Sequence, residues 1–326
     1  MKRLFSVAPM LDWTDTHCRY FHRLLTKQAV LYTEMVTTSA LLQGQTERYL
    51  SFNQAEHPLA LQLGGSEPKE MAQCAVLAAD FGYDEVNINV GCPSERVQKG
   101  AFGACLMAEP QLIADCVAAM QAKVTIPVTV KNRIGIDDQE DYEGLHNFVS
   151  TVAQAGCQTF IIHARKAWLK GLSPKENREI PPLRYDLVYQ LKQAFPQLEI
   201  IINGGITSLE ACQLHLQSVD GVMVGREAYH NPWLLAEVDQ AIYGSAASQL
   251  DRYAVLEQLL VYIEEQQAQG VRVSHIGRHS LGLFQGLPGA KQWRRHLSEQ
   301  MHRPEANLNL FKQAAKKVLD ASPPSL

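Results

Sequence analysis

The sequence lacks the cysteine patterns that mark disulfide-rich and zinc-binding proteins. Its 326 residues include seven cysteines, but none forms a Cys-x-x-Cys pair, and no group of cysteines and histidines has the spacing of zinc ligands. An odd number of scattered thiols is typical of a protein kept in a reducing compartment. We therefore expect neither a disulfide framework nor a bound metal.

Long apolar runs are missing as well. Runs such as Phe160-Ile161-Ile162 are far shorter than the roughly 20 residues that cross a bilayer as a helix. The chain enters Leu4-Phe5-Ser6-Val7 without an apolar leader behind a basic segment. These absences predict a cytoplasmic protein that does not interact with membranes.

Two features of nucleotide-related proteins are absent too. The formal net charge is -4, which argues against a protein that coats nucleic acid over its whole surface but leaves room for a local basic face. No Gly-x-Gly-x-x-Gly follows the first apolar run, so the sequence does not support a Rossmann-type dinucleotide site.

What the sequence does contain is a regular alternation of apolar and helical segments. Short, continuously apolar, β-branched runs read as strands buried on both faces, and they lie at residues 4–8, 30–35, 59–63, 85–90, 128–131, 159–163, 199–202 and 221–224. Helical patterns lie between most of them, at residues 68–81, 110–123, 142–155, 184–194 and 209–217. Eight strands with helical crossovers favour an α/β fold, a closed parallel (β/α)8 TIM barrel, over an open doubly wound sheet.

The pattern changes near residue 250. A stretch of small and polar residues at 243–249 precedes a segment with helical periodicity and no strand-like run. We predict a barrel catalytic domain at residues 1–243 and a small all-helical C-terminal domain at 251–326, of which the last residues, 322–326, look disordered.

Polar and glycine residues follow the predicted strands, where barrels of this kind place their active sites. After the seventh and eighth strands come Asn203-Gly204-Gly205 and Gly225-Arg226, which offer bare backbone N–H groups and a cation. Loops at these two positions commonly hold a phosphate group. The alternative is that the glycines only make a tight turn.

Three further side chains at strand ends are candidates for ligand contacts. Lys131 could stabilise negative charge on a ligand such as the N1–C2=O edge of a reduced flavin, and Gln62 offers both a donor and an acceptor to a ring edge. Alternatively, Lys131 extends into solvent, and His163 is a core histidine whose ring nitrogens are satisfied within the protein.

Cys92 is the candidate catalytic residue. It lies between Gly91 and Pro93 at the end of the fourth predicted strand, and a thiol there can give a proton to a carbanion-like centre without a metal. Most cysteines are small buried apolar groups, and we assign that role to Cys74, Cys116, Cys157 and Cys212, which lie in helical patterns.

Several of these segments together resemble a known family. Ala8-Pro9-Met10-Leu11-Asp12-Trp13-Thr14-Asp15, Asn87-Ile88-Asn89-Val90-Gly91-Cys92-Pro93-Ser94 and Ile202-Asn203-Gly204-Gly205-Ile206 are similar to motifs of the tRNA-dihydrouridine synthases, and the similarity runs nearly end to end. The segments from His163 to Trp168 and from Leu172 to Pro182, with Gly282-Leu283-Phe284-Gln285-Gly286 and Gln292-Trp293-Arg294-Arg295, resemble the bacterial A subgroup, which acts at tRNA positions 20 and 20a.

The resemblance implies a cofactor, a reductant and a reaction. NADPH (or NADH) would reduce FMN, flavin N5 would deliver hydride to C6 of a flipped-out D-loop uracil, and Cys92 would protonate C5 to give 5,6-dihydrouridine. The residues that would hold FMN are Pro9, Met10, Leu11, Gln62, Lys131, His163, Asn203, Gly204, Gly205, Gly225 and Arg226.

The basic residues favour RNA over a free pyrimidine or DNA as the partner. The long loop at residues 164–182 carries five lysines and arginines against two glutamates, and from residue 251 onward the chain has ten basic against seven acidic residues. Basic residues around Trp293 and Phe284 would suit an unstacked RNA loop, although each alone reads as a solvated surface group. The resemblance implies that tRNA is oriented by Asn89, Lys175, Arg178, Lys291 and Arg294 in a monomeric protein.

Two other functions stay open from the residues themselves. One is an FMN barrel that reduces a small free molecule, such as a pyrimidine or an enone, and gives the basic helical segment no role. The other is a non-enzymatic RNA-binding protein on a degenerate barrel. The second predicts loss of the thiol or of the phosphate cradle, yet Cys92, Lys131 and Gly225-Arg226 are all present.

Overall fold

The computed structural model describes residues 2–44, 46–139, 141–246 and 249–321. These residues group into two compact units, and each is described by itself. The first joins Met1–Asp12 to Val30–Gly225, and the second joins Trp13–Ala29 to Arg226–Leu326.

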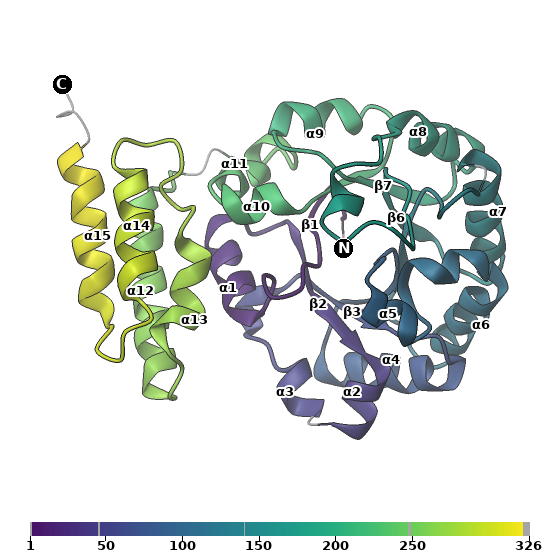
Figure 1. Ribbon diagram of the computed structural model, residues 1–326, viewed down its shortest axis with the longest axis horizontal. Coiled ribbons are helices and arrows are strands. Elements are labelled where there is room, and N and C mark those ends of the chain that lie inside the picture. Colours follow the sequence, from purple (N-terminus) through teal and green to yellow (C-terminus); the bar gives the residue numbers. More distant parts are fainter. Residues whose placement is uncertain (1, 45, 140, 247–248, 322–326) are drawn as a thin grey trace. The chain divides into compact units, whose positions relative to one another are not determined.

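The first unit is a closed barrel of eight parallel strands that pair in chain order (Figure 1). Hydrogen bonds between β1 and β8 close the ring, with Val7 opposite Val224. The strands are β1 (Phe5–Val7), β2 (Val30–Thr37), β3 (Leu59–Gly64), β4 (Glu85–Val90), β5 (Val128–Arg133), β6 (Thr159–His163), β7 (Glu199–Asn203) and β8 (Gly221–Val224).

Helices follow the strands of this unit, as a parallel barrel requires. They are α2 (Thr38–Gln43), α3 (Thr46–Leu50), α4 (Pro68–Phe81), α5 (Glu95–Lys99), α6 (Pro110–Gln121), α7 (Asp141–Gln154), α8 (Tyr185–Ala194) and α9 (Leu209–His215). The sequence sets their ends locally. In α4, the Glu67 side chain caps the first turn, Pro68 occupies the first helical position, and Gly82 ends the helix with a φ of 92°.

Apolar side chains fill the middle of the barrel. Residues from five strands, with Ala8 directly after β1, contact one another there, which is possible only inside the ring, and they are Ala8, Val30, Tyr32, Ala60, Ile161, Ile201 and Met223. Side chains of the opposite parity, such as Ile162 and Val222, are equally buried because helices cover the outside of the sheet. This double burial is why the strands read as continuous apolar runs rather than as alternating ones.

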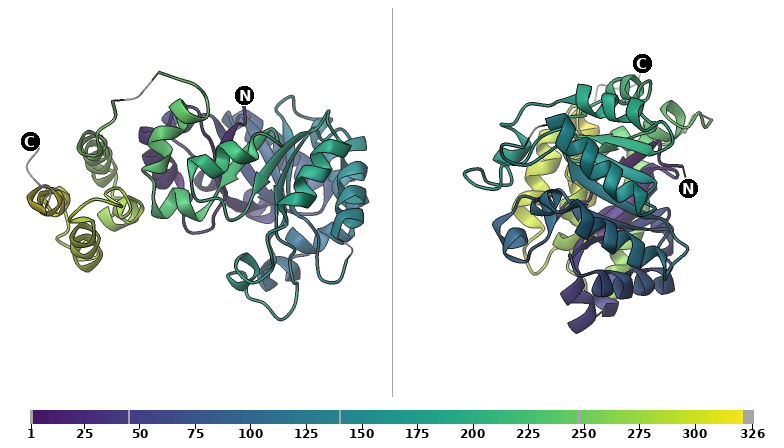
Figure 2. Two further views of the ribbon diagram at one scale, coloured as in Figure 1. Left: turned by 90° about the horizontal axis from the view of Figure 1, so that it is seen from above. Right: turned by 90° about the vertical axis from the view of Figure 1, so that its right-hand side faces the viewer.

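The second unit is helical. It comprises α1 (Thr16–Leu25), α10 (Arg226–His230), α11 (Leu234–Ala241), α12 (Arg252–Ala268), α13 (Val273–Gly277), α14 (Ala290–Gln300) and α15 (Leu308–Ala321). In Figure 2, helices α12 to α15, coloured from green to yellow, pack together, and Trp293 and Phe311 among them are fully buried. Asp15 caps α1 by accepting a hydrogen bond from the backbone N–H of Cys18.

The predicted fold class is confirmed, since the chain forms an eight-stranded TIM barrel followed by C-terminal helices. The predicted domain boundary between residues 243 and 251 stays a prediction, because the compact units divide the chain by packing and place residues 13–29 and 226–250 with the C-terminal helices. The expected disordered tail, 322–326, lies outside the described residues. Among the described helices, none is both long and apolar enough to cross a membrane.

Candidate active site

Strand alternation gathers polar side chains at the carboxyl end of the barrel. Ile161, Ile201 and Met223 face the interior, so the residues two positions further along the same strands also face inward. Those residues are His163, Asn203 and Gly225. The register pairs His163 with Asn203, and Asn203 with Met223. The interior therefore changes from apolar to polar at the end where the sequence predicts the site.

The segment after β1 reaches the same end. Gly225 follows β8, and a Cβ built on it would lie 3.5 Å from the Ala8 Cβ and 3.6 Å from the Met10 sulfur, so the backbone there lies close to Met10. Pro9 and Met10 are partly buried, and Leu11 is 65% exposed. Arg226 follows Gly225 directly in the chain and begins α10 of the second unit.

His163 is not a core histidine with satisfied nitrogens. Its Nδ1 is buried and has no hydrogen-bond partner among the residues that the structure describes. Burial, reinforced by the nearby positive charges of Arg133 and Lys131, holds the pKa of His163 well below its usual value, so the ring is neutral. A buried ring nitrogen without a partner costs free energy unless a ligand completes it.

Lys131 also lacks a partner among the residues that the structure describes. It is half-buried. Burial and the neighbouring Arg133 charge lower the pKa of Lys131 to about 7. The backbone register places it beside Asn89 of β4. A cation held in this way is suited to an anionic ligand.

The glycines after β7 adopt conformations that other residues avoid. Gly204 has a φ of 115° and Gly205 a φ of 71°. A Cβ on Gly204 would lie 3.2 Å from the His163 ring, and one on Gly205 would lie 2.5 Å from Leu183. Close packing and positive φ together explain why both positions are glycine. Neither residue carries a side chain that could cover its own backbone N–H group.

The Cys92 turn is held by Asn89. The Asn89 Oδ1 accepts hydrogen bonds from the backbone N–H groups of Gly91 and Cys92, both at 3.0 Å. The Cys92 carbonyl accepts the N–H of Ala104 at 2.9 Å. Cys92 is partly exposed, and its sulfur lies close enough to Lys131 for a negative charge on it to raise the pKa of that lysine against the effect of burial.

The other cysteines that we assigned to the core are buried there. Burial raises the pKa of the Cys74, Cys116, Cys157 and Cys212 thiols to about 12, which makes them inert. Across the described residues, no group of three or more histidine, cysteine or acidic side chains is arranged to hold a metal ion.

Gln62 and Asn89 belong to a buried polar chain. Asn89 donates to the Gln62 Oε1 at 2.9 Å, and Gln62 donates to Asn87 at 2.8 Å. Asn87 in turn donates to Thr129 at 2.8 Å. Within the described part of the chain, each of these amide groups donates one of its two N–H groups to a side chain. Asn89, expected from the resemblance to contact tRNA, also holds the turn through Gly91 and Cys92, a local role that sequence reasoning missed.

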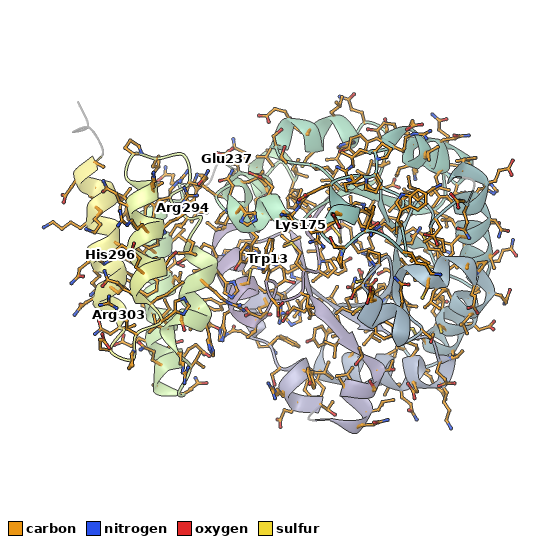
Figure 3. The ribbon with its side chains drawn as sticks, viewed as in Figure 1. Trp13, Lys175, Glu237, Arg294, His296 and Arg303 are labelled. Carbon is orange, nitrogen blue, oxygen red and sulfur yellow. The ribbon has the colours of Figure 1, made fainter. Side chains whose placement is uncertain are left out.

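The predicted RNA-contacting loop after β6 is ordered by Asn177. This side chain is fully buried, accepts the Trp168 N–H at 2.7 Å and donates to the carbonyls of Trp168 and Leu172. Lys175 and Arg178 flank it and are exposed, and Figure 3 labels Lys175. The loop is therefore a fixed support for two cations rather than a loose segment.

In the second unit, Lys291 and Arg294 are exposed on α14. Arg294, labelled in Figure 3, donates to the Gln285 side chain at 3.1 Å. It also lines a pocket of about 430 Å³, together with residues that the sequence did not single out, among them Tyr229, His230 and Asn231.

The expectation that Trp293 and Phe284 form an aromatic surface is wrong. Both are fully buried, with ring centroids 4.8 Å apart in an edge-to-face arrangement, and the Trp293 indole donates to the Ser280 carbonyl. His279, counted among the basic residues around them, is 1% exposed and bonded to Asp15. Trp293 is flanked by cations in the sequence, but the helical period of α14 turns it into the core, and Phe284, in the turn before that helix, packs against it.

Arg133 is a residue of this region that sequence reasoning did not select. Its guanidinium donates to the carbonyl of Gly91 at 3.1 Å and to those of Lys166 and Asn177 at 3.2 and 2.9 Å. The sequence did offer a signal. Arg133 lies two residues after Lys131 on the same strand, so both side chains face the barrel interior.

The chain is similar to known proteins over nearly its whole length. The model of the dihydrouridine synthase family matches residues 6–320. The tRNA-dihydrouridine(20/20a) synthase of Shewanella oneidensis is 64% identical over 318 residues, covering 98% of this chain and 95% of that protein. The synthases of the same name from Vibrio cholerae (62%; 96% of each chain) and Escherichia coli K12 (62%; 97% of this chain, 92% of that one) are similarly close.

A solved structure shows the fold alone. A 2-naphthoyl-CoA reductase in complex with 2-naphthoyl-CoA superposes with a TM-score of 0.56 at 10% identity, over 73% of this chain and 50% of the other. Because the family model spans nearly the whole sequence and identity to its members exceeds 60%, this protein belongs to the dihydrouridine synthase family.

Proposed function

We propose that this protein reduces uridine to 5,6-dihydrouridine in the D-loop of tRNA, at positions 20 and 20a, with FMN as cofactor and NADPH (or NADH) as reductant. One observation carries the proposal: among the described residues, the buried His163 Nδ1 and the Lys131 ammonium have no hydrogen-bond partner, and both lie with the partly exposed Cys92 at one end of the barrel. Similarity at above 60% identity to tRNA-dihydrouridine(20/20a) synthases supports the substrate and the positions.

The residues present fit a flavin mononucleotide. The orphaned His163 Nδ1 needs a hydrogen-bond partner, Lys131 needs negative charge, and the positive-φ glycines 204 and 205 bare the backbone where a phosphate group is commonly held. We assign binding of FMN to these residues with Pro9, Met10, Leu11, Gln62, Asn203, Gly225 and Arg226. Bound FMN supplies the hydride that reduces the uracil ring.

The chain itself supplies the proton and the positioning. The Cys92 thiol donates a proton to C5 of the base, and Asn89 orients that thiol by holding the backbone of the turn. Lys131 provides positive charge beside the ring system, where negative charge develops on reduction. Because the site lies at the barrel mouth, the uridine must leave its stack to reach it.

Contacts to tRNA are assigned to four exposed cations and one partly buried amide. The cations are Lys175 and Arg178 in the first unit and Lys291 and Arg294 in the second, and the amide is Asn89 in the first unit. Phosphate contacts of this kind orient an RNA without reading its sequence. A tRNA substrate also supports the expected cytoplasmic location, and the monomeric state stays a prediction.

The affinity of the apoprotein for FMN should depend on pH through Lys131. Without an anionic ligand the pKa of this lysine is about 7, so above pH 7 the amine loses its proton. An anion binds the charged form better, and binding above pH 7 must therefore take up a proton. The Kd for FMN, measured by fluorescence quenching, should rise between pH 7 and 9 by up to about tenfold per pH unit.

Two variants control this titration. Lys131→Met should bind FMN more weakly at pH 7 and show a Kd that hardly changes up to pH 9. Lys123→Met, at an exposed lysine after α6, should behave like the wild type. A wild-type Kd that is constant over this range would remove Lys131 from the cofactor site.

The tRNA contacts are tested by single alanine substitutions. Lys175→Ala and Arg294→Ala should each raise the KM for tRNA about threefold to tenfold, since each removes a phosphate contact. The rate of NADPH oxidation without tRNA should stay unchanged. Matched controls are Lys123→Ala for the lysine and, on the same helix as Arg294, Arg295→Ala, whose guanidinium pairs with Glu299. A KM that responds equally to the controls would contradict the assignment.

The choice of substrate distinguishes the proposed function from that of a reductase of small free molecules. Purified protein should form dihydrouridine in a tRNA transcript, detected by mass spectrometry of the nucleosides, and should leave free uridine and uracil unreduced. Rapid reduction of the free base with no activity on tRNA would favour the alternative function.

A further inference from the structure

Arg133 joins three segments of the barrel mouth. It ends β5, and only 4% of it is exposed. Its Nε donates to the Gly91 carbonyl at 3.1 Å, and its Nη1 donates to the carbonyls of Asn177 and Lys166 at 2.9 and 3.2 Å. One side chain thus bridges the strand that carries Lys131, the turn before Cys92 and the loop after β6.

Both bridged segments carry residues of the proposed reaction. Gly91 directly precedes Cys92, so a shift of the Gly91 carbonyl moves the thiol. Asn177 lies between Lys175 and Arg178, and its side chain fixes the rest of the loop through Trp168. The bonds from Arg133 therefore connect the proton donor with the loop that we assign to tRNA binding.

Stability alone does not account for a charge at this position. Among the described residues, no carboxylate pairs with Arg133, whose partners are the three carbonyls. Burial, and to a lesser extent the charges of Arg178 and Arg165, lower the pKa of Arg133 to about 10. Keeping a buried cation without a counter-charge costs free energy of folding. A side chain kept at such a cost points to a functional role.

The geometry also explains why arginine is needed. A guanidinium directs several N–H groups in fixed, divergent directions from one plane. The ammonium of a lysine is a point donor on a flexible stem and would reach one of these carbonyls at a time.

We propose that Arg133 is a positioning residue, which fixes the Cys92 turn relative to the loop that carries Lys175 and Arg178. Substrate held by that loop is thereby presented to the thiol in one geometry. This inference rests on the proposed function, because it concerns the same reaction.

The first test is Arg133→Lys in the full-length, FMN-loaded protein with a tRNA transcript. A misplaced acid and a loosened loop should lower kcat about tenfold or more and raise the KM for tRNA about fivefold. FMN content and the rate of flavin reduction by NADPH should stay within about twofold, because neither depends on the loop. The control Arg295→Lys should match the wild type in all four measurements.

The second test is a double-mutant cycle with Lys175→Ala. If Arg133 acts through the loop, then Lys175→Ala should raise KM at least about threefold less in the Arg133→Lys background than in the wild type. A purely structural role predicts independent effects that multiply, and that outcome would overturn the proposal.

A third variant guards against misfolding. Arg133→Gln is shorter and neutral, keeps one donor group and should show the same pattern as Arg133→Lys. Loss of the fold or of FMN in both variants would show that Arg133 is scaffold, and the proposal would fail. Wild-type protein that makes no dihydrouridine would instead refute the proposed function, whereas active wild type with an unchanged Arg133→Lys refutes this inference alone.

Discussion

Cys92→Ala should lower the rate of dihydrouridine formation by at least about a hundredfold, the contribution expected of a general acid. The loss arises because no other partly exposed thiol is placed on the Gly91–Pro93 turn to protonate C5 of the base. FMN should remain bound, and NADPH should still reduce it, since we assign Cys92 neither to FMN binding nor to flavin reduction. The measurement is single-turnover dihydrouridine formation in a tRNA transcript, followed by mass spectrometry.

The matched control is Cys105, which like Cys92 is partly exposed. The Cys105 thiol donates to the Phe102 carbonyl at 3.2 Å, and burial raises its pKa. Cys105→Ala should leave the rate within about twofold of wild type. Equal turnover by Cys92→Ala and wild type would mean that another group supplies the proton.

Glu85→Ala should lower the free energy of unfolding by about 3–5 kcal/mol, because it removes the fully buried carboxylate that pairs with Arg3 and leaves the Tyr32 and Thr129 hydroxyls without their acceptor, while only the Glu199 carboxylate still pairs with Arg3. Glu85 is fully buried at the start of β4 and accepts hydrogen bonds from Arg3 at 2.6 Å and from Tyr32 at 2.7 Å. Thr129 donates to the same carboxylate at 2.6 Å, so four strands or their flanks meet there. Urea denaturation monitored by circular dichroism gives the number.

A surface ion pair provides the contrast. Arg295 and Glu299 lie one turn apart on α14, and their side chains are 77% and 56% exposed. Glu299→Ala should therefore change the free energy of unfolding by less than about 1 kcal/mol. If the two substitutions cost the same, the buried network around Glu85 does not stabilise the barrel as its geometry indicates.

The strands could be predicted closely because their signal is local. The predicted ranges 85–90, 159–163 and 221–224 match β4, β6 and β8 at both ends. Double burial makes each strand a continuous apolar run, and the polar residue that ends it marks the barrel mouth. Helix α1 (Thr16–Leu25), in contrast, was not predicted. Its buried residues include Arg19, His22 and Arg23, so its apolar pattern is interrupted.

Only some of the residues in the candidate site could be identified from the sequence. His163 ends β6 and Lys131 lies two residues before the end of β5, so their position in the sequence implies their position in the barrel. Arg133 was overlooked, and the hydrogen bond from Asn89 to Gln62 was not foreseen, because these partners lie on other strands and loops, at separations of 27 to 44 residues. The expected surface position of Trp293 was wrong for the same reason, since its burial depends on the helices packed around it.

The sequence by itself determined the barrel, the order of its elements and the residues that reach its mouth, because strand period and strand ends are properties of short segments. Only the tertiary structure decided which of those residues are satisfied and which still lack a partner. His163 Nδ1 is an orphan and Trp293 is core because hydrogen bonds and burial are made between segments far apart in the chain. The chemistry of the site follows from those long-range contacts, which no local pattern encodes.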